Sequence, residues 1–442
     1  MKNALRFSLI FVLVFARVAA AQAPLVDAAK HDDRTRLREL LEKRVDVNAS
    51  AADGTTALHW ASYHDDLESV DLLVRAGARV NAANDLGATP LWAASQNGSA
   101  AMVRRLLQAG ANPNAALLAG ETPVMIAARS GNPDVVGQLL AKGANVNARA
   151  ARGQTALMWA VAQKHPEVVK VLLAHGADIH ARSEVWSQVM AVPPHGVLEY
   201  NRSIPHGGDT ALMFAARVGD LASARQLVEA GANVNDADAW GVSAMVLAAH
   251  SGFRELVEFL LEKGADANSA AAGYTALHEA IMRRDEAMAS ALLARGADPN
   301  APLQTWTPTR RQSTDFNFAP ELVGATPFWL AARFAEPALM RLLVKHGARP
   351  LFVHRASYYA GDPAERRTQV TTALMAATGM GGGVAWVQPR RAESEATMLE
   401  AVKLAIELGV DVNVVNSDGR TALDAARALK YESVASFLLG KQ

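Results

Sequence analysis

The sequence predicts an all-α fold, a solenoid of stacked helix–turn–helix units joined by β-hairpin-like fingers. The first observation is a period of 33 residues between glycines of successive units, at Gly54, Gly87, Gly120 and Gly153. The second is a threonine two residues after each of these glycines, and the third is a Gly-Ala step that closes each unit after a leucine-rich segment. Internal repeats with a fixed period of about 20 to 50 residues are typical of solenoids.

A hydroxyl residue is expected to begin the first helix of each unit. A serine or threonine side chain can accept a hydrogen bond from a free backbone N–H at a helix N-terminus, and a following proline fits the first helical turn. Prolines stand there at Pro90, Pro123 and Pro327. The ten hydroxyl positions are Thr56, Thr89, Thr122, Thr155, Thr210, Ser243, Thr275, Thr326, Thr372 and Thr421.

A glycine is expected just past the end of each second helix, where a left-handed residue is favoured. These glycines are Gly77, Gly110, Gly143, Gly176, Gly231, Gly264, Gly296 and Gly347. One helix–turn–helix unit cannot bury its apolar face alone, so stacking of the units must supply the core.

The segments "TALHWA", "TPLWAAS", "TALHEA" and "GANVNA" resemble the ankyrin repeat. The resemblance extends from about residue 25 to residue 442, as roughly 11 units including two charged caps. It implies a binding scaffold without catalysis that has a long concave wall. We expect residues 24–442 to form a single solenoid.

Residues 1–23 are typical of a secretory signal peptide. Lys2 and Arg6 precede an apolar run from Phe7 to Ala16, and small residues follow through Ala23, with cleavage expected after Ala21. The alternative is an uncleaved anchor, but the run has only about 10 apolar residues where about 20 would span a bilayer. We therefore expect an exported protein, periplasmic or extracellular and of bacterial type, without stable membrane insertion after cleavage.

Composition limits the partners. The 44 basic and 44 acidic residues give a formal net charge of zero, so no global field would hold the chain on nucleic acid. The chain has no cysteine, which excludes disulfides and thiolate metal sites. We expect a monomer that binds a protein partner and no nucleic acid.

The period is interrupted four times. The intervals from Gly153 to Gly208, Gly273 to Gly324 and Thr326 to Thr372 carry 22, 18 and 13 extra residues. These three insertions lie between a Gly-Ala step and the next turn, so we expect longer fingers at about 181–207, 301–323 and 351–369. A fourth insertion, at about 379–394, lies inside its unit between the two helices.

The long fingers are the candidate partner-binding site. They hold 8 of the 26 aromatic residues together with several arginines, a composition typical of binding hot spots. The alternative is that the rings only pack each finger onto its neighbours. Trp240 and Tyr274, which flank the turn glycines of two intervening units, are expected to be exposed beside them. The whole candidate set is Trp186, His195, Tyr200, Arg202, His206, Trp240, Tyr274, Trp306, Arg310, Arg311, Phe316, Phe318, Arg355, Tyr358 and Tyr359.

No pattern predicts a catalytic residue, a cofactor or a metal. The segment "LHEAIM" has Met282 where a zinc protease helix needs its second histidine. His195 and His206 could bind zinc or sense pH, but two matched turns explain them equally well. Met125, Met158, Met213 and Met375 form one column, which a Cu(I) site or core packing would explain. Because successive layers lie about 9–10 Å apart, packing is favoured.

These observations predict an exported, non-catalytic scaffold that binds another protein through its concave wall and its enlarged fingers. Two alternatives remain open. One is a small-molecule or carbohydrate receptor in which Trp186, Tyr200 and Trp306 stack on the ligand. The other is an accessory factor that protects a redox enzyme of the same compartment.

Overall fold

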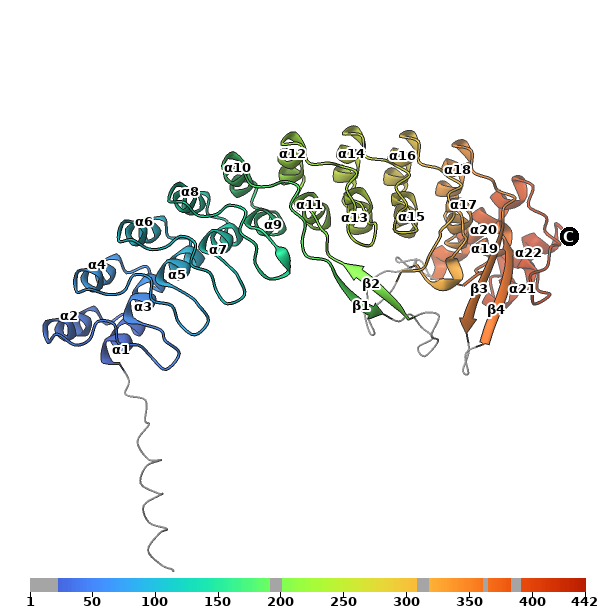
Figure 1. Ribbon diagram of the computed structural model, residues 1–442. Coiled ribbons are helices and arrows are strands. Elements are labelled where there is room, and N and C mark those ends of the chain that lie inside the picture. Colours follow the sequence, from blue (N-terminus) through green and yellow to red (C-terminus); the bar gives the residue numbers. More distant parts are fainter. Residues whose placement is uncertain (1–22, 191–200, 308–317, 361–364, 383–390) are drawn as a thin grey trace, which may run out of the picture. The chain divides into compact units, whose positions relative to one another are not determined.

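The computed structural model describes residues 23–190, 201–307, 318–360, 365–382 and 391–442, so residues 1–22 of the expected signal peptide lie outside it. The predicted fold class is confirmed, because two-helix repeats follow one another through both units of the described chain (Figure 1). The chain divides into two compact units between Ala181 and Arg182. None of the described helices is long and apolar enough to cross a membrane.

In unit 1, the first helices of the repeats stack on one another and the second helices form a parallel layer behind them. The first helices are α1 (Pro24–Lys30), α3 (Ala57–Tyr63), α5 (Pro90–Asn97), α7 (Pro123–Ser130) and α9 (Ala156–Ala162). The second helices are α2 (Arg34–Glu42), α4 (Leu67–Arg75), α6 (Ala100–Gln108), α8 (Pro133–Ala141) and α10 (Pro166–Ala174), and a short 3-10 turn, η1, covers Ala151–Gly153.

Unit 2 repeats this two-layer arrangement. Its first helices are α11 (Ala211–Val218), α13 (Ala244–Ser251), α15 (Ala276–Met282), α17 (Pro327–Arg333), α19 (Ala373–Ala377) and α21 (Ala422–Leu429). Its second helices are α12 (Leu221–Glu229), α14 (Arg254–Glu262), α16 (Glu286–Ala294), α18 (Pro337–Lys345), α20 (Arg391–Glu407) and α22 (Glu432–Leu439).

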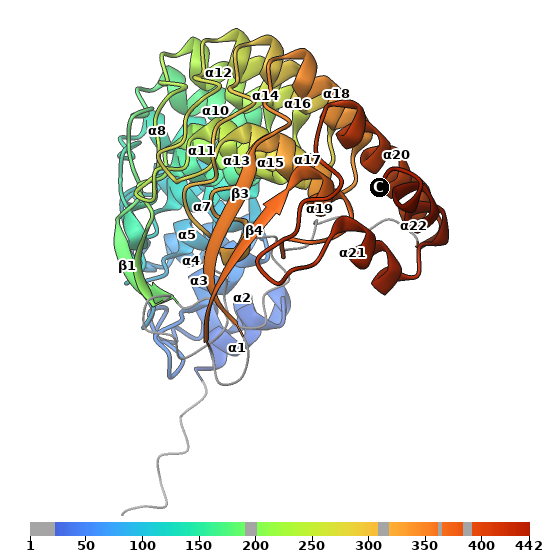
Figure 2. The same cartoon turned by 90° about the vertical axis from the view of Figure 1, so that its right-hand side faces the viewer.

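Unit 2 also contains two antiparallel hairpins and a 3-10 turn. Strand β1 (Trp186–Met190) pairs with β2 (Arg202–His206), β3 (Val353–Ala360) pairs with β4 (Glu365–Thr372), and η3 covers Pro320–Leu322. Both hairpins extend from the side of the first helices (Figure 1), and β3 and β4 lie side by side along their length (Figure 2).

The helix ends follow the predicted chemistry. The Thr89 hydroxyl accepts a hydrogen bond from the Trp92 N–H at 3.2 Å, and Pro90 occupies the first turn of α5. Past the second helix, Gly77 has a φ of +91°, a conformation that an L side chain would strain. Capping of this kind satisfies backbone groups that a short helix cannot satisfy itself.

Asparagine side chains link successive fingers. The Asn114 amide donates to the Gly143 carbonyl at 2.9 Å and accepts from the Asn145 N–H at 2.7 Å. Asn268 makes the same pair of bonds in unit 2, at 2.8 Å to the Gly296 carbonyl and 2.7 Å from the Asp298 N–H. Each such asparagine therefore fixes the position of the next finger along the stack and maintains the spacing between repeats.

The insertions lengthen the fingers at their tips. In a regular finger, the N–H of one residue donates to the carbonyl four residues later, as Leu117 does to Glu121 at 2.9 Å. The equivalent pairs of the three long fingers are Ser183–Asp209, Leu303–Ala325 and His354–Thr371. Their separations of 26, 22 and 17 residues exceed four by the 22, 18 and 13 extra residues of the sequence.

Candidate functional site

The three long fingers of unit 2 form the candidate site, and we name them lobe 1 (182–209), lobe 2 (301–325) and lobe 3 (353–372). The base of lobe 1 is fixed by hydrogen bonds. The Ser183 N–H donates to the Asp209 carbonyl at 2.9 Å, and the Asp209 N–H donates to Ser183 Oγ at 3.0 Å. Arg217 of α11 donates to Asp209 Oδ1 at 2.8 Å, so the base of the hairpin is also held to a helix.

Within lobe 1, the rings of Trp186 and His206 stack on each other. They are direct cross-strand neighbours, with ring centroids 4.5 Å apart and an interplanar angle of 22°. Both side chains are half-buried. Ile204 and Met190 lie on the same face of the hairpin and are buried, so this face of lobe 1 packs against other parts of the protein.

Trp306 joins the three lobes. Only 5% of its surface is exposed, and Val323 of lobe 2 and Tyr359 of lobe 3 pack against it. The guanidinium carbon of Arg202 in lobe 1 lies 5.0 Å from the Trp306 ring centroid. A guanidinium on an indole face is a favourable cation–π contact, so one buried ring holds together segments far apart in the sequence.

Phe318 fixes lobe 2 to the adjacent repeat. It is fully buried, with its ring centroid 5.2 Å from that of Tyr274 and 6.2 Å from that of His278 in α15. Its N–H donates to Thr307 Oγ1 at 2.8 Å. Burial raises the pKa of Tyr274 and lowers the pKa of His278 to about 4, because both charged forms lose their hydration here.

His354 anchors lobe 3. Its side chain is fully buried, its Nε2 donates to the Val323 carbonyl at 3.0 Å, and its ring lies 4.2 Å from that of Trp329 in α17. Burial lowers the pKa of His354, so it stays neutral at pH 7. Lobes 2 and 3 are thus connected by a hydrogen bond as well as by the Trp306–Tyr359 packing.

The opposite face of lobe 3 is charged. Strand alternation places Arg355, Ser357 and Tyr359 on one face, with Arg366 directly opposite Tyr359. Arg355 and Arg366 are exposed, and Arg366 Nε donates to Ser357 Oγ at 3.0 Å. This face of lobe 3 therefore carries exposed arginines beside Tyr359, which packs against the buried Trp306 ring.

The candidate residues divide into three groups. Trp306, Phe318 and Tyr274 are buried, so the expectation that Tyr274 is an exposed tip residue is wrong: Phe318 of lobe 2 covers it. Arg202 and Arg355 are exposed, whereas Trp186, His206, Trp240, Tyr358 and Tyr359 are half-buried. The remaining candidates lie outside the described residues: His195, Tyr200, Arg310, Arg311 and Phe316.

One buried charged residue was not among the candidates. Glu279 of α15 is 2% exposed, and the Nδ1 atom of His250 lies 3.3 Å from its Oε2. Burial is the largest influence on this carboxyl and raises its pKa. The sequence signal for Glu279 was its position in the repeat. The residue four after the helix N-cap is apolar in other units, as at Trp60, Ile126 and Phe214, and Glu279 is charged.

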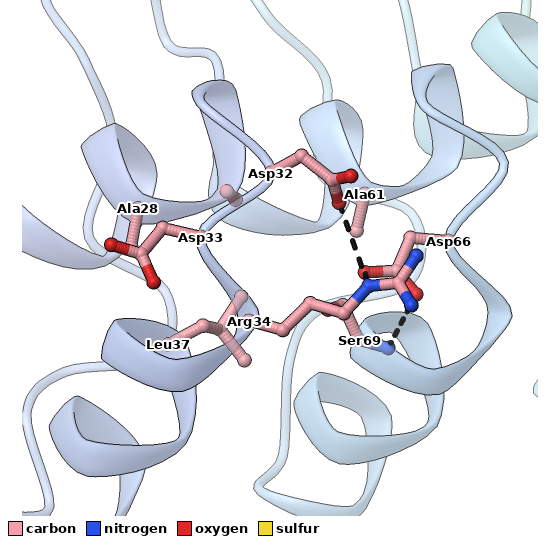
Figure 3. Close-up of a pocket in the computed structure, with 9 residues that line it drawn as sticks. Ala28, Asp32, Asp33, Arg34, Leu37, Ala61, Asp66 and Ser69 are labelled. Carbon is pink, nitrogen blue, oxygen red and sulfur yellow. Dashed lines mark hydrogen bonds and ion pairs between the residues drawn. The ribbon is translucent and has the colours of Figure 1, made fainter.

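The methionine column belongs to the core and is not a metal site. Met125, Met158, Met213 and Met375 are at most 1% exposed and belong to the core, each on a different first helix. Figure 3 shows a small cleft between the first two repeats, where Arg34 Nε contacts Asp66 Oδ2 at 3.0 Å and closes it. Within the described residues, no three His, Asp or Glu side chains are grouped to hold a metal ion.

Comparison with known proteins gives one family. The model described as "Ankyrin repeats (3 copies)" matches residues 25–116, 116–183 and 212–302, more than half of the chain. The chain is similar to a "Putative palmitoyltransferase ZDHHC13" of Danio rerio, with 30% identity over 242 residues, 49% of this chain and 32% of the relative. It thus spans about a third of that relative's length.

A solved structure is also similar, the "Crystal structure of human ASB11 ankyrin repeat domain". The two chains are 28% identical, the TM-score is 0.45, and the match covers 55% of this chain and 99% of that one.

Proposed function

Because the chain belongs to the ankyrin-repeat family, whose repeats serve as protein-interaction scaffolds, we propose that it is an exported, non-catalytic scaffold that binds another protein through its first helices and its three lobes. The observation that carries this proposal is the Trp306 contact with Arg202 and Tyr359. It joins three insertions into one surface, whereas three independent loops would have no reason to meet.

The composition of this joined surface supports a protein partner. Arginine and aromatic residues dominate the energetics of protein interfaces, and hot spots work best when the surrounding structure already fixes them. Here the buried side chains of Trp306, Phe318 and His354 hold the lobes in place. The side chains of Arg202 and Arg355 are exposed to solvent. A partner would therefore meet a surface that needs little ordering on binding.

The alternative of a carbohydrate receptor is less favoured. A sugar stacks on an open aromatic face, but Trp306 is almost fully buried and Arg202 covers its ring. The ring of Trp186 is stacked on His206. These contacts support a partner that binds the exposed arginines and not a ligand that stacks on the indole faces.

Export is part of the proposal and rests on the N-terminal pattern, with Lys2 and Arg6 before the apolar run from Phe7 to Ala16. The absence of cysteine is compatible with an oxidising compartment. Mass spectrometry of the chain recovered from its cells tests this point. A mature N-terminus at Gln22 is the expected result, and an intact Met1 in the cytoplasmic fraction would contradict export.

The binding function is tested by shortening lobe 1. Residues 184–208 are replaced with the three-residue turn Leu118–Gly120, so that Ser183 and Asp209 again lie four residues apart, as Leu117 and Glu121 do. In-cell crosslinking should then lose a partner that the parent captures. The matched control places the same turn at residues 85–87 of unit 1, between Asn84 and Ala88, which hold no candidate residue, and should keep that partner.

The shortened protein must still unfold cooperatively, so that a lost partner is not attributed to misfolding. If the shortened protein and the parent crosslink to the same partners in the same amounts, the lobes serve packing alone and the proposal is wrong for this surface.

A further inference from the structure

The proposed function leaves the chemistry of the partner open, and the inference here rests on that function. We propose that Arg202, Trp306, Tyr359 and Arg366, which we name the arginine–aromatic face, bind carboxylates of an acidic segment in the protein partner.

Arg202 is held in a geometry suited to a carboxylate. Its guanidinium lies over the Trp306 ring, with 5.0 Å between the guanidinium carbon and the ring centroid, while the side chain is exposed to solvent. Because the Arg202 side chain remains exposed in this contact, its guanidinium N–H groups are accessible to a ligand. Their planar arrangement matches the two oxygens of a carboxylate, and a fixed guanidinium loses less entropy when it binds.

Arg366 is held from the other side. It lies directly opposite Tyr359 in the β3–β4 pair, and Tyr359 packs on the same Trp306 ring. The bond from its Nε to Ser357 Oγ at 3.0 Å restrains the side chain and leaves the terminal nitrogens of the guanidinium for a ligand. The two arginines therefore flank one aromatic centre, although they come from lobes 1 and 3.

Neither guanidinium has a carboxylate partner among the described residues. Arginines at the bases of the lobes and repeats are paired: Arg182 lies 3.0 Å from Asp236, and Arg217 lies 2.8 Å from Asp209. By contrast, no described acidic group forms an ion pair with Arg202 or Arg366, and strand alternation places the nearby Glu365 on the other face of β4. Charge complementarity thus indicates an acidic ligand.

A protein segment fits this face better than a nucleic acid does. Nucleic-acid binding relies on many phosphate contacts and on bases stacked on open rings. This chain has a net charge of zero, and the central ring is 95% covered. Two restrained guanidinium groups around an apolar centre match a few carboxylates beside an apolar side chain.

The experiment uses the full mature chain and a fluorescein-labelled peptide of about 12 residues that carries six glutamates and two leucines. We expect the peptide to bind and its affinity to fall steeply as salt increases, because the contacts are ionic. The double variant Arg202→Glu, Arg366→Glu should weaken binding by tenfold or more. A matched peptide with six lysines and a single-stranded oligonucleotide of equal negative charge should bind at least tenfold more weakly than the glutamate peptide.

The control variant Arg36→Glu, Arg104→Glu changes two exposed arginines of unit 1 by the same total charge and should bind like the parent. Arg202→Gln, Arg366→Gln provides a milder change if the reversed charges disturb folding, and melting of every variant checks this. Equal binding by the double variant and the parent overturns the inference, as does equal binding of the oligonucleotide. If lobe shortening still removes the cellular partner in that case, the proposed function stands and only the carboxylate assignment fails.

Discussion

Units 1 and 2 differ in their fingers and share almost everything else. In unit 1 every finger closes with a pair four residues apart, such as Asn84–Ala88, and in unit 2 the pairs Ser183–Asp209 and Leu303–Ala325 are separated by 26 and 22 residues. A threonine or serine precedes the first helices from α3 onward, and the helices form the same two layers, in both units. A repeat can therefore carry a lobe at its tip without a change in its stacking, provided the pair at the base is kept.

Insertions of the chain cover two first helices of unit 2, α15 and α17. In unit 1, Trp60 and Trp159 are half-buried, with Lys30 and Arg129 over their rings. The equivalent positions Glu279 and Leu330 in unit 2 are buried, whereas Phe214 in unit 2 is half-buried and Ile126 in unit 1 is buried. Phe318 lies against His278 of α15, and the Gly382 carbonyl accepts from Arg333 Nε of α17 at 2.8 Å, so the insertions lie on these helices.

The largest expected effect comes from removing the ring that joins the lobes. Trp306→Ala should destabilise unit 2 by about 3 kcal/mol, the usual cost of truncating a buried indole. Trp159→Ala in unit 1 should cost about 1 kcal/mol, because its ring is only half-buried. Urea unfolding gives both values. Hydrogen exchange should accelerate in Arg202–His206 and Val353–Ala360 in the first variant alone.

Equal losses of unfolding free energy for Trp306→Ala and Trp159→Ala would contradict the prediction. The buried ring between the lobes would then contribute no more to stability than a half-buried ring on a first helix of unit 1. Unchanged exchange in both hairpins of Trp306→Ala would show that Trp306 packs locally and does not join the lobes.

Much of the fold followed from local rules. The 33-residue period, the hydroxyl caps and the closing glycines all act within one repeat, so a single sequence contains them. The location of the insertions followed as well, because the period shows where residues are extra. His59 and His278 bond to the backbone of their own N-caps, at 3.1 Å from Nδ1 to the Thr56 and Thr275 N–H groups.

The candidate site followed only in part, because its contacts are not local. Composition indicated that the lobes are aromatic and arginine-rich, but the contact between Arg202 and Trp306 joins residues about 100 positions apart and has no periodic signal. The burial of Tyr274 depends on Phe318, which belongs to an insertion in the following finger. The asparagine bonds between fingers were not predicted, because both of their partners belong to the next repeat and are brought close only by stacking.

A smaller effect is expected from acidification. Burial holds the pKa of His278 at about 4, while the unfolded chain titrates near its ordinary 6.5. Above pH 6.5 both states are neutral and the full stability is present; as the pH falls from 6.5 toward 4, the unfolded state binds the proton first and stability is lost. Between pH 7.5 and 5.0 this one group should lower the unfolding free energy of unit 2 by about 2 kcal/mol.

His278→Gln isolates that contribution, because glutamine at this position can still bond to the Thr275 N–H and does not titrate. Its urea midpoint should change less with pH than that of the parent. The raised pKa of Glu279 acts in the opposite direction, with stability lost as the pH rises, and it is common to both proteins. His346→Gln, at an exposed position, is the control and should follow the parent; an identical pH response of His278→Gln would contradict the prediction.

The smallest expected effect concerns the asparagine bonds between neighbouring fingers, which both units share. Asn114→Ala in unit 1 and Asn268→Ala in unit 2 each remove one donor and one acceptor bond between neighbouring fingers, with nearly equal distances in the two units. These groups are exposed, so water replaces part of each bond and we expect a cost of about 1 kcal/mol per variant. Asn114→Asp keeps the acceptor for the Asn145 N–H and should cost less than Asn114→Ala. If the lobes do not affect the stacking of the repeats, urea unfolding will give the same loss of unfolding free energy in both units. A clearly larger loss for Asn268→Ala would mean that the lobes make the bonds between neighbouring fingers more important for stability.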